Sequence, residues 1–178
     1  MKFHITLVAT IACISLTALA AEPTFGPYIE NGGPVFLVED RDVPLRAGHK
    51  YRVVFEVTDY LNEMTDLNLE LETVARFMNM HGKHGIPLDD LDVAVVVHGK
   101  ALLAVMNDEI YEEMHGIKNP SLGLIDELAN SGVKFYACGQ SLGFRGLNKS
   151  VLTDSVKVGL SAMTMLVTLQ ADGYTFLP

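Results

Sequence analysis

LDVAVVVHG, residues 91–99, is the stretch of this chain that decides the fold. Apart from Asp92, residues 91–97 form an unbroken apolar run rich in β-branched side chains. Such a run predicts a strand that is covered on both faces, as in a parallel sheet. The run stops at His98 and Gly99, which places both residues at the carboxyl end of the strand, where sites in open α/β sheets lie.

The segments around this strand alternate between two hydrophobic periodicities, which predict strands and helices in turn. Alternating strands and helices imply right-handed crossovers and a sheet with helices on both faces. The sequence therefore predicts a single α/β domain built on a doubly covered, mainly parallel β-sheet. The predicted order is a half-covered strand over 51–57, a helix over 67–81, the strand over 91–97, a helix over 121–131, a strand over 133–137, a helix over 157–171 and a last strand over 174–177.

Local signals predict where two of these elements begin or end. Gly82 is expected to stop the first helix, and Asn119 is expected to cap the second, with Pro120 at its first position. Residues 157–171 are apolar nearly all round, which favours a packed helix over a surface one.

The first twenty residues have the three regions of a secretory signal peptide: a basic start at Lys2, an apolar run and a small-residue end. Ala18 and Ala20 fit the small-x-small rule, so cleavage is expected after Ala20, with Ala21 as the next site. A retained anchor is the alternative, but the apolar run falls short of the roughly 20 residues that span a bilayer. The organisation expected is a signal peptide at 1–20, an irregular Gly- and Pro-rich arm at 21–48 and the domain at 49–178.

The charge balance is acidic, with a formal net charge of −9 at pH 7 that becomes more negative when Lys2 is removed. This balance argues against nucleic acid or an anionic membrane as a partner. We expect a periplasmic or secreted protein with no membrane contact after cleavage.

Of the two cysteines, Cys13 leaves with the signal peptide and Cys138 stays, so the exported chain has no internal disulfide. A single thiol in an oxidising compartment has to be buried, guarded or used. Cys138 ends a predicted strand, and the turn Gly139-Gln140-Ser141 that follows offers backbone N–H groups that would stabilise a thiolate. A buried structural cysteine is the alternative.

Histidines offer two further kinds of chemistry. His98 ends the central strand and could face the crevice of Cys138 as a base or a cation, although no third residue that would orient it is evident. His81 and His84 do not form a closed set of metal ligands. We therefore predict neither a metal nor a cofactor.

Three strings carry a resemblance to a known family: VVVHGKAL at 95–102, NPSLGLIDELANSGVKFYACGQSL at 119–142 and SVKVGLSAMTMLVTLQADGYTF at 155–176. Over residues 50–178 the chain resembles the bacterial DsrE/DsrF-like family, named after subunits linked to sulfur oxidation. The resemblance implies a parallel sheet, assembly into trimers or hexamers, and a sulfur-carrying position that matches Cys138. Cytoplasmic members pass sulfur as a cysteine persulfide, whereas this chain carries a signal peptide and a CGQS turn.

Three functions remain open at this point. The first is binding or transfer of sulfane sulfur on Cys138, between a donor and an acceptor that are small sulfur compounds or proteins. The second is a noncatalytic ligand-binding or assembly subunit with a structural cysteine, and the third is a cysteine hydrolase with His98 as base. The candidate site residues are Cys138 and His98 as reacting groups and Gly99, Asn119, Gly139, Gln140 and Ser141 as ligand-binding residues.

Overall fold

The structure is a computed structural model that describes residues 22–178. The predicted signal peptide lies outside these residues. Strand β2 (Leu91–Val97) forms the middle of a five-stranded sheet of order β4-β3-β2-β1-β5, and every neighbouring pair is parallel. The other strands are β1 (Tyr51–Val57), β3 (Lys134–Cys138), β4 (Val156–Gly159) and β5 (Thr175–Leu177).

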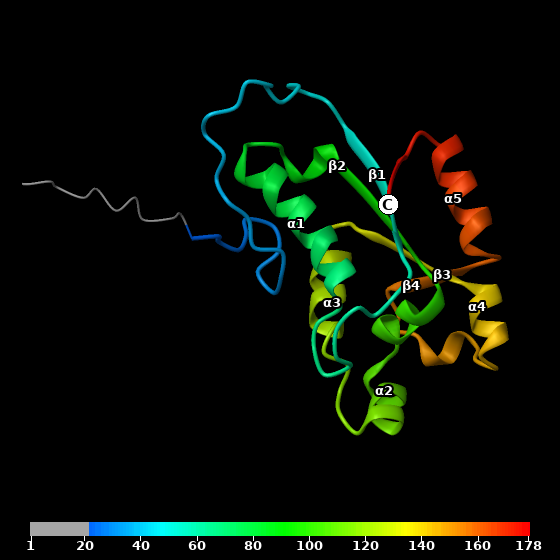
Figure 1. Ribbon diagram of the computed structural model, residues 1–178. Coiled ribbons are helices and arrows are strands. Elements are labelled where there is room, and N and C mark those ends of the chain that lie inside the picture. The colour runs from blue at the N-terminus through cyan, green and yellow to red at the C-terminus, as the bar shows by residue number, and fades with distance from the viewer. Residues whose placement is uncertain (1–21) are drawn as a thin grey trace, which may run out of the picture.

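Helices cover both faces of the sheet, as Figure 1 shows. On one face, α1 (Leu69–Lys83) and α3 (Leu122–Asn130) pack on the odd-numbered residues of β2, such as Val95. On the other face, α5 (Ala162–Ala171) packs on the even-numbered residues. The remaining elements are the 3₁₀ segments η1 (Leu88–Asp90), η2 (Gly99–Val105) and η3 (Lys149–Val151) and the helices α2 (Asp108–His115) and α4 (Gly139–Phe144).

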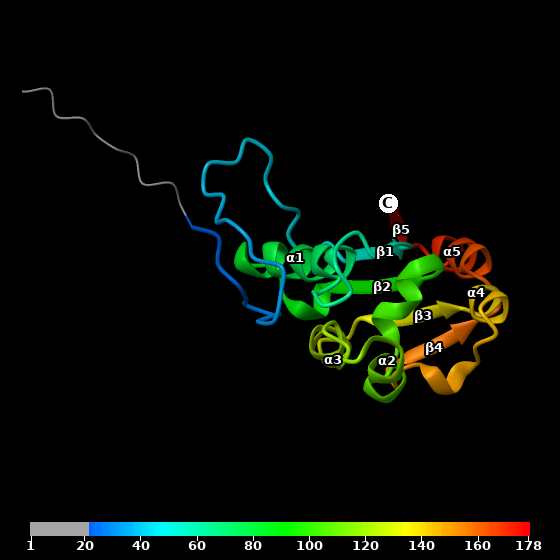
Figure 2. The same cartoon turned by 60° about the horizontal axis from the view of Figure 1, so that its bottom comes forward.

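The direction of the crossovers explains why α5 lies alone on its face. The chain moves along the sheet from β1 to β2, β3 and β4, one neighbour at a time, and then returns to β5 at the far edge, beside β1. Because crossovers between parallel strands are right-handed, a return in the opposite direction requires a helix on the opposite face. Figure 2 shows the strands side by side, with α4 and α5 meeting the sheet near the ends of β3 and β4.

The change of face creates a switch point between β3 and β4. Leu142 of α4, which follows β3, is buried in the core on the side of α1 and α3. Ala162 of α5, which follows β4, is buried on the opposite side. Ligand sites in open α/β sheets lie in the crevice that such a divergence opens at the carboxyl ends of the strands.

The predicted fold class is confirmed, and the strands at 51–57 and 91–97 have the predicted bounds. The prediction for 157–171 is wrong in its first part, because Val156–Gly159 forms the edge strand β4 and α5 begins only at Ala162. Ser161 sets that start, since its side chain caps the helix by accepting from the N–H of Thr164. The apolar composition is continuous across the strand and the helix, which hid the boundary.

Gly82 does not stop the first helix, because α1 continues to Lys83. A Cβ at position 82 would lie 2.4 Å from a ring carbon of Tyr28 and 2.9 Å from Cγ of Pro27. This glycine therefore lets the N-terminal arm pack against the helix.

The described part of the arm, residues 22–48, is irregular apart from one antiparallel bridge between Thr24 and Val35. Its anchor is the fully buried side chain of Asn79 on α1. Asn79 Oδ1 accepts from the N–H of Tyr28 and of Ile29, and Nδ2 donates to three arm carbonyls. A buried backbone group without a partner costs about 1–3 kcal/mol, so the bonds of Asn79 hold residues 28–33 of the arm against α1.

Asn119 and Pro120 precede α3 instead of capping it directly, since the helix begins at Leu122. Asn119 Oδ1 accepts from Ser121 N at 2.9 Å, and Nδ2 donates to the carbonyls of Ala104 and Met106. Asn119 therefore ties the turn before α3 to the end of η2.

The outer face of α5 is apolar and exposed, contrary to the expectation of a packed helix. Met163 is 76% exposed and Val167 69% exposed, and Leu160 just before the helix is exposed as well. The helix contains no charged residue in AMTMLVTLQA. No helix within residues 22–178 combines the length and the apolar character that crossing a bilayer requires.

Candidate functional site

Cys138 is both the last residue of β3 and the N-cap of α4. It pairs with Gly159 of β4, so the sulfur lies at the switch point where the two following helices diverge. The residue is 5% exposed and packs with Val96 and Ala162 on the α5 face of the sheet. The fold thus holds the thiol at the place where α/β sheets bind ligands.

The surroundings of Sγ favour the thiolate. Burial raises the pKa of the Cys138 thiol, but hydrogen bonds to the sulfur lower it by more, so that the net pKa lies below its ordinary value. The largest of these opposing effects comes from the Ser141 hydroxyl, followed by the backbone N–H groups of Ser141, Ala162 and Gln140. The Ser141 N–H lies 3.4 Å from Sγ.

These donors come from two helices. Gln140 and Ser141 are in the first turn of α4, and Ala162 is the first residue of α5. N–H groups of a first turn have no partner within their own helix and carry the positive end of its dipole. These N–H groups, which the helices themselves leave free, lower the pKa of the thiol, and that of Ser141 donates to Sγ.

Gly139 makes the convergence of these helices possible. A Cβ at this position would lie 2.8 Å from the carbonyl oxygen of Gly159 and 3.2 Å from that of Leu160. Any side chain at 139 would push α4 away from the connection that leads into α5. Gly139 and Gln140 also line a shallow hollow of about 300 Å³ on α4, together with Gly143 and Phe144.

His98 lies next to Cys138 in the sheet, but its ring is engaged elsewhere. The register pairs Val97 with Ala137, and one further step sets His98 beside Cys138, both on the α5 face. His98 Nε2 forms a 2.9 Å contact with Oε1 of Glu56 on β1, the strand on the other side. No hydrogen bond joins the side chains of His98 and Cys138 among the described residues.

Gly99 belongs to the site through its backbone. Its N–H donates to Ser141 Oγ at 3.4 Å, and its φ of +60° is a conformation that favours glycine. A Cβ there would also lie 2.6 Å from the carbonyl oxygen of Thr58. Asn119, by contrast, is buried, and its side chain forms hydrogen bonds to the backbone of Ala104, Met106 and Ser121. The structure therefore does not bring Asn119 to the thiol.

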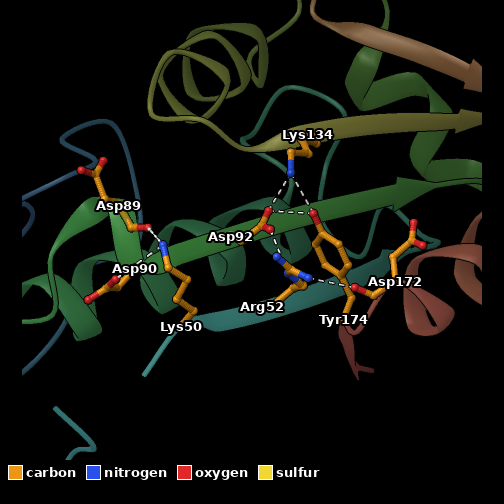
Figure 3. Close-up of polar contacts among 8 residues, drawn as sticks. All are labelled: Lys50, Arg52, Asp89, Asp90, Asp92, Lys134, Asp172 and Tyr174. Carbon is orange, nitrogen blue, oxygen red and sulfur yellow. Dashed lines mark hydrogen bonds and ion pairs between the residues drawn. The ribbon is translucent and has the colours of Figure 1, made fainter. Parts of the chain in front are cut away.

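A second polar cluster lies at the opposite end of the same strands (Figure 3). Asp92 on β2 accepts from Lys134 of β3 at 2.7 Å, from the Tyr174 hydroxyl at 2.7 Å and from Arg52 of β1 at 3.0 Å. Burial raises the pKa of Asp92, but the bonds from Lys134 and Tyr174 lower it by more, and the bond to Asp92 raises the pKa of Lys134 to about 12. Arg52 also donates to the carbonyl of Asp172. The cluster thus ties three strands to the turn after α5.

His81 and His84 are engaged in the fold. His81 Nδ1 contacts the carbonyl of Phe77, and His84 contacts Met80 O through Nδ1 and the N–H of Val38 through Nε2. Within residues 22–178, no group of three or more His, Cys, Asp or Glu side chains is arranged to hold a metal ion.

Sequence reasoning missed two members of the site. Ala162 acts through its backbone N–H, so the identity of its side chain could not indicate this role. Glu56 was visible as a polar residue in an apolar strand, and this was a usable signal that a partner lies beside it.

Substitution of two glycines of α4 tests whether the close approach of α4 and α5 lowers the pKa of Cys138. We expect Gly139→Ala to raise the pH midpoint of iodoacetamide labelling, because the new methyl group separates Sγ from the N–H of Ala162. Gly143→Ala is the matched control, since nothing lies within 4 Å of its added Cβ. Equal midpoints for the two variants and the wild type would contradict this geometry.

Comparisons with known proteins agree with this architecture. The DsrE/DsrF-like family matches residues 49–178. A solved structure, the protein of unknown function MTH1491 from Methanobacterium thermoautotrophicum, matches with a TM-score of 0.53 and 23% identity, over 71% of this chain and 97% of that one. A comparison with curated proteins gives no match. Since the family match spans most of the chain, including all five strands and Cys138, this protein belongs to the DsrE/DsrF-like family.

Proposed function

We propose that this protein carries sulfane sulfur as a persulfide on Cys138. The observation that carries the proposal is the set of hydrogen-bond donors from α4 and α5 around one sulfur atom. A thiolate is the nucleophile in sulfur exchange, and these donors lower the pKa of the thiol against the effect of burial. Membership in the family supports a function of the sulfur-relay type.

The chemistry is a pair of exchanges at sulfur. The Cys138 thiolate attacks the sulfane sulfur of an inorganic polysulfide or of thiosulfate, and a bond forms between Sγ and that sulfur. The donor's own sulfur–sulfur bond breaks, and its electron pair leaves on the shortened polysulfide or on sulfite. An acceptor thiolate then attacks the outer sulfur of the persulfide, and Cys138 leaves as a thiolate. Neither exchange changes the total number of protons or electrons.

The surroundings fit a small anionic donor. The shallow hollow on α4 is open, and the loaded persulfide would extend from the sulfur at the start of this helix. Export to the periplasm or beyond, after removal of residues 1–20, is part of the same proposal. The donor would then be an extracytoplasmic sulfur compound, and the acceptor a thiol of a small molecule or a partner protein.

The alternative is a subunit in which Cys138 is only structural. A structural thiol gains nothing from donors that stabilise its charged form, whereas the donors around Sγ do so. A hydrolase with His98 as base has less support. Glu56 holds Nε2 as an orienting carboxylate would, but no hydrogen bond joins the side chains of His98 and Cys138 among the described residues.

Peptide mass spectrometry tests the persulfide directly. After exposure to polysulfide or thiosulfate and alkylation, the peptide that contains Cys138 should gain the mass of one sulfur atom. Reduction should remove this mass, and Cys138→Ser should show none. If the unfolded protein takes up sulfur from these donors and the native protein takes up none, Cys138 is a structural residue and the proposal is wrong.

We also propose that the apolar face of α5 joins copies of this chain in the expected trimer or hexamer. The face carries no charge, whereas the chain as a whole is acidic, so like-charge repulsion between copies is smallest there.

Met163→Lys and Val167→Lys should each shift the mass measured by light scattering toward the monomer. Val43→Lys, at an exposed position of the arm, is the control. A wild-type monomer across micromolar concentrations would refute the assembly.

A further inference from the structure

Arg145, an exposed residue at the C-cap of α4, has a contact that connects it to the thiol. Its Nη2 donates to the carbonyl oxygen of Gly99 at 3.1 Å. The N–H of the same glycine donates to Ser141 Oγ. Gly99 is therefore held at both ends by α4: through Ser141 in the first turn and through Arg145 just past the last.

The hydrogen bond from the Gly99 N–H restricts the direction in which the Ser141 hydroxyl can donate its proton. A backbone N–H only donates, so it occupies a lone pair of Oγ, and the single hydroxyl proton has to point to another acceptor. Ser141 is three residues after Cys138, and its own N–H already faces Sγ. The hydroxyl proton is thus free for the sulfur, in keeping with the lowering of the Cys138 pKa by the Ser141 side chain.

Gly99 is suited to this task because only glycine fits at this position. Its φ is positive, and an added Cβ would clash with the carbonyl of Thr58. The carbonyl of Thr58 in turn accepts from the N–H of Ala101, which fixes the start of η2 against the end of β1. The bond from Arg145 completes the restraint on the Gly99 peptide from the side of α4.

We propose that Arg145 is a positioning residue of the Cys138 site, acting through Gly99 to hold the Ser141 hydroxyl as a donor to the reacting sulfur. This inference rests on the proposed function for its biological purpose, since a thiolate held ready is what sulfur exchange requires. The guanidinium need not touch the sulfur compound. Its effect passes through two hydrogen bonds, in contrast to a direct attraction between its charge and the thiolate.

A double-variant cycle on the pH midpoint of iodoacetamide labelling separates these two routes. Ser141→Ala should raise the midpoint by about one unit, the scale of one hydrogen bond to a charged group. Arg145→Ala should raise it by less, and Arg145→Lys, which retains a donor for Gly99, should restore most of the wild-type value. In the double variant Ser141→Ala with Arg145→Ala, the midpoint should equal that of Ser141→Ala alone.

Lys149→Ala is the control for charge, because it removes an exposed cation four residues after Arg145 that forms no hydrogen bond with Gly99. It should leave the midpoint unchanged, and thermal unfolding should show that every variant is folded. Additive shifts in the double variant, or no shift in Arg145→Ala, would overturn the proposal. Labelling requires no sulfur donor, so this result is independent of whether the protein takes up sulfane sulfur.

Discussion

One sulfur atom lies at the start of two helices whose N–H groups lower the pKa of its thiol, and the arrangement of the molecule around its site depends on this convergence. Burial alone would keep Cys138 neutral and inert, since removing a thiolate from water is unfavourable. The donors lower the pKa of the thiol by more than burial raises it, and they do so without a positively charged side chain beside the sulfur. The thiol is consequently shielded from bulk solvent and still inclined to ionise, a combination that fits the proposed role as a carrier of reactive sulfur.

The convergence follows from topology. Because β4 connects to β5 across the whole sheet, α5 has to leave on the face opposite to α4, and the two helices part directly above Cys138 and Gly159. Glycine at 139 then allows the two chain segments to approach within van der Waals contact. The polar cluster around Asp92 holds the other end of the same strands together, so the sheet is fixed at both ends of the face that α5 covers.

The sequence could predict much of this and not the rest. The strands at 51–57 and 91–97 carry clear periodicity and were placed at their observed bounds, and the lone cysteine pointed to the site. The donor at Ala162 could not be predicted, because a backbone N–H is common to nearly all residue types and its position depends on the path of α5. β4 was merged with α5 because Val156 and Val158 continue the apolar character of the helix. Gly82 and Gly139 are explained only by what packs against them, Tyr28 in one case and the Gly159 carbonyl in the other.

The central claim, that the fold stabilises the Cys138 thiolate, is tested most directly by the ultraviolet absorbance of the thiolate as a function of pH, with Cys138→Ser as the blank. Because the donors outweigh burial, the midpoint of ionisation should lie below the value of about 8.5 for a free thiol. In denaturant the midpoint should return to that value, since the donors are then lost. A midpoint in the folded protein at or above the denatured value would show that burial dominates and would contradict the account.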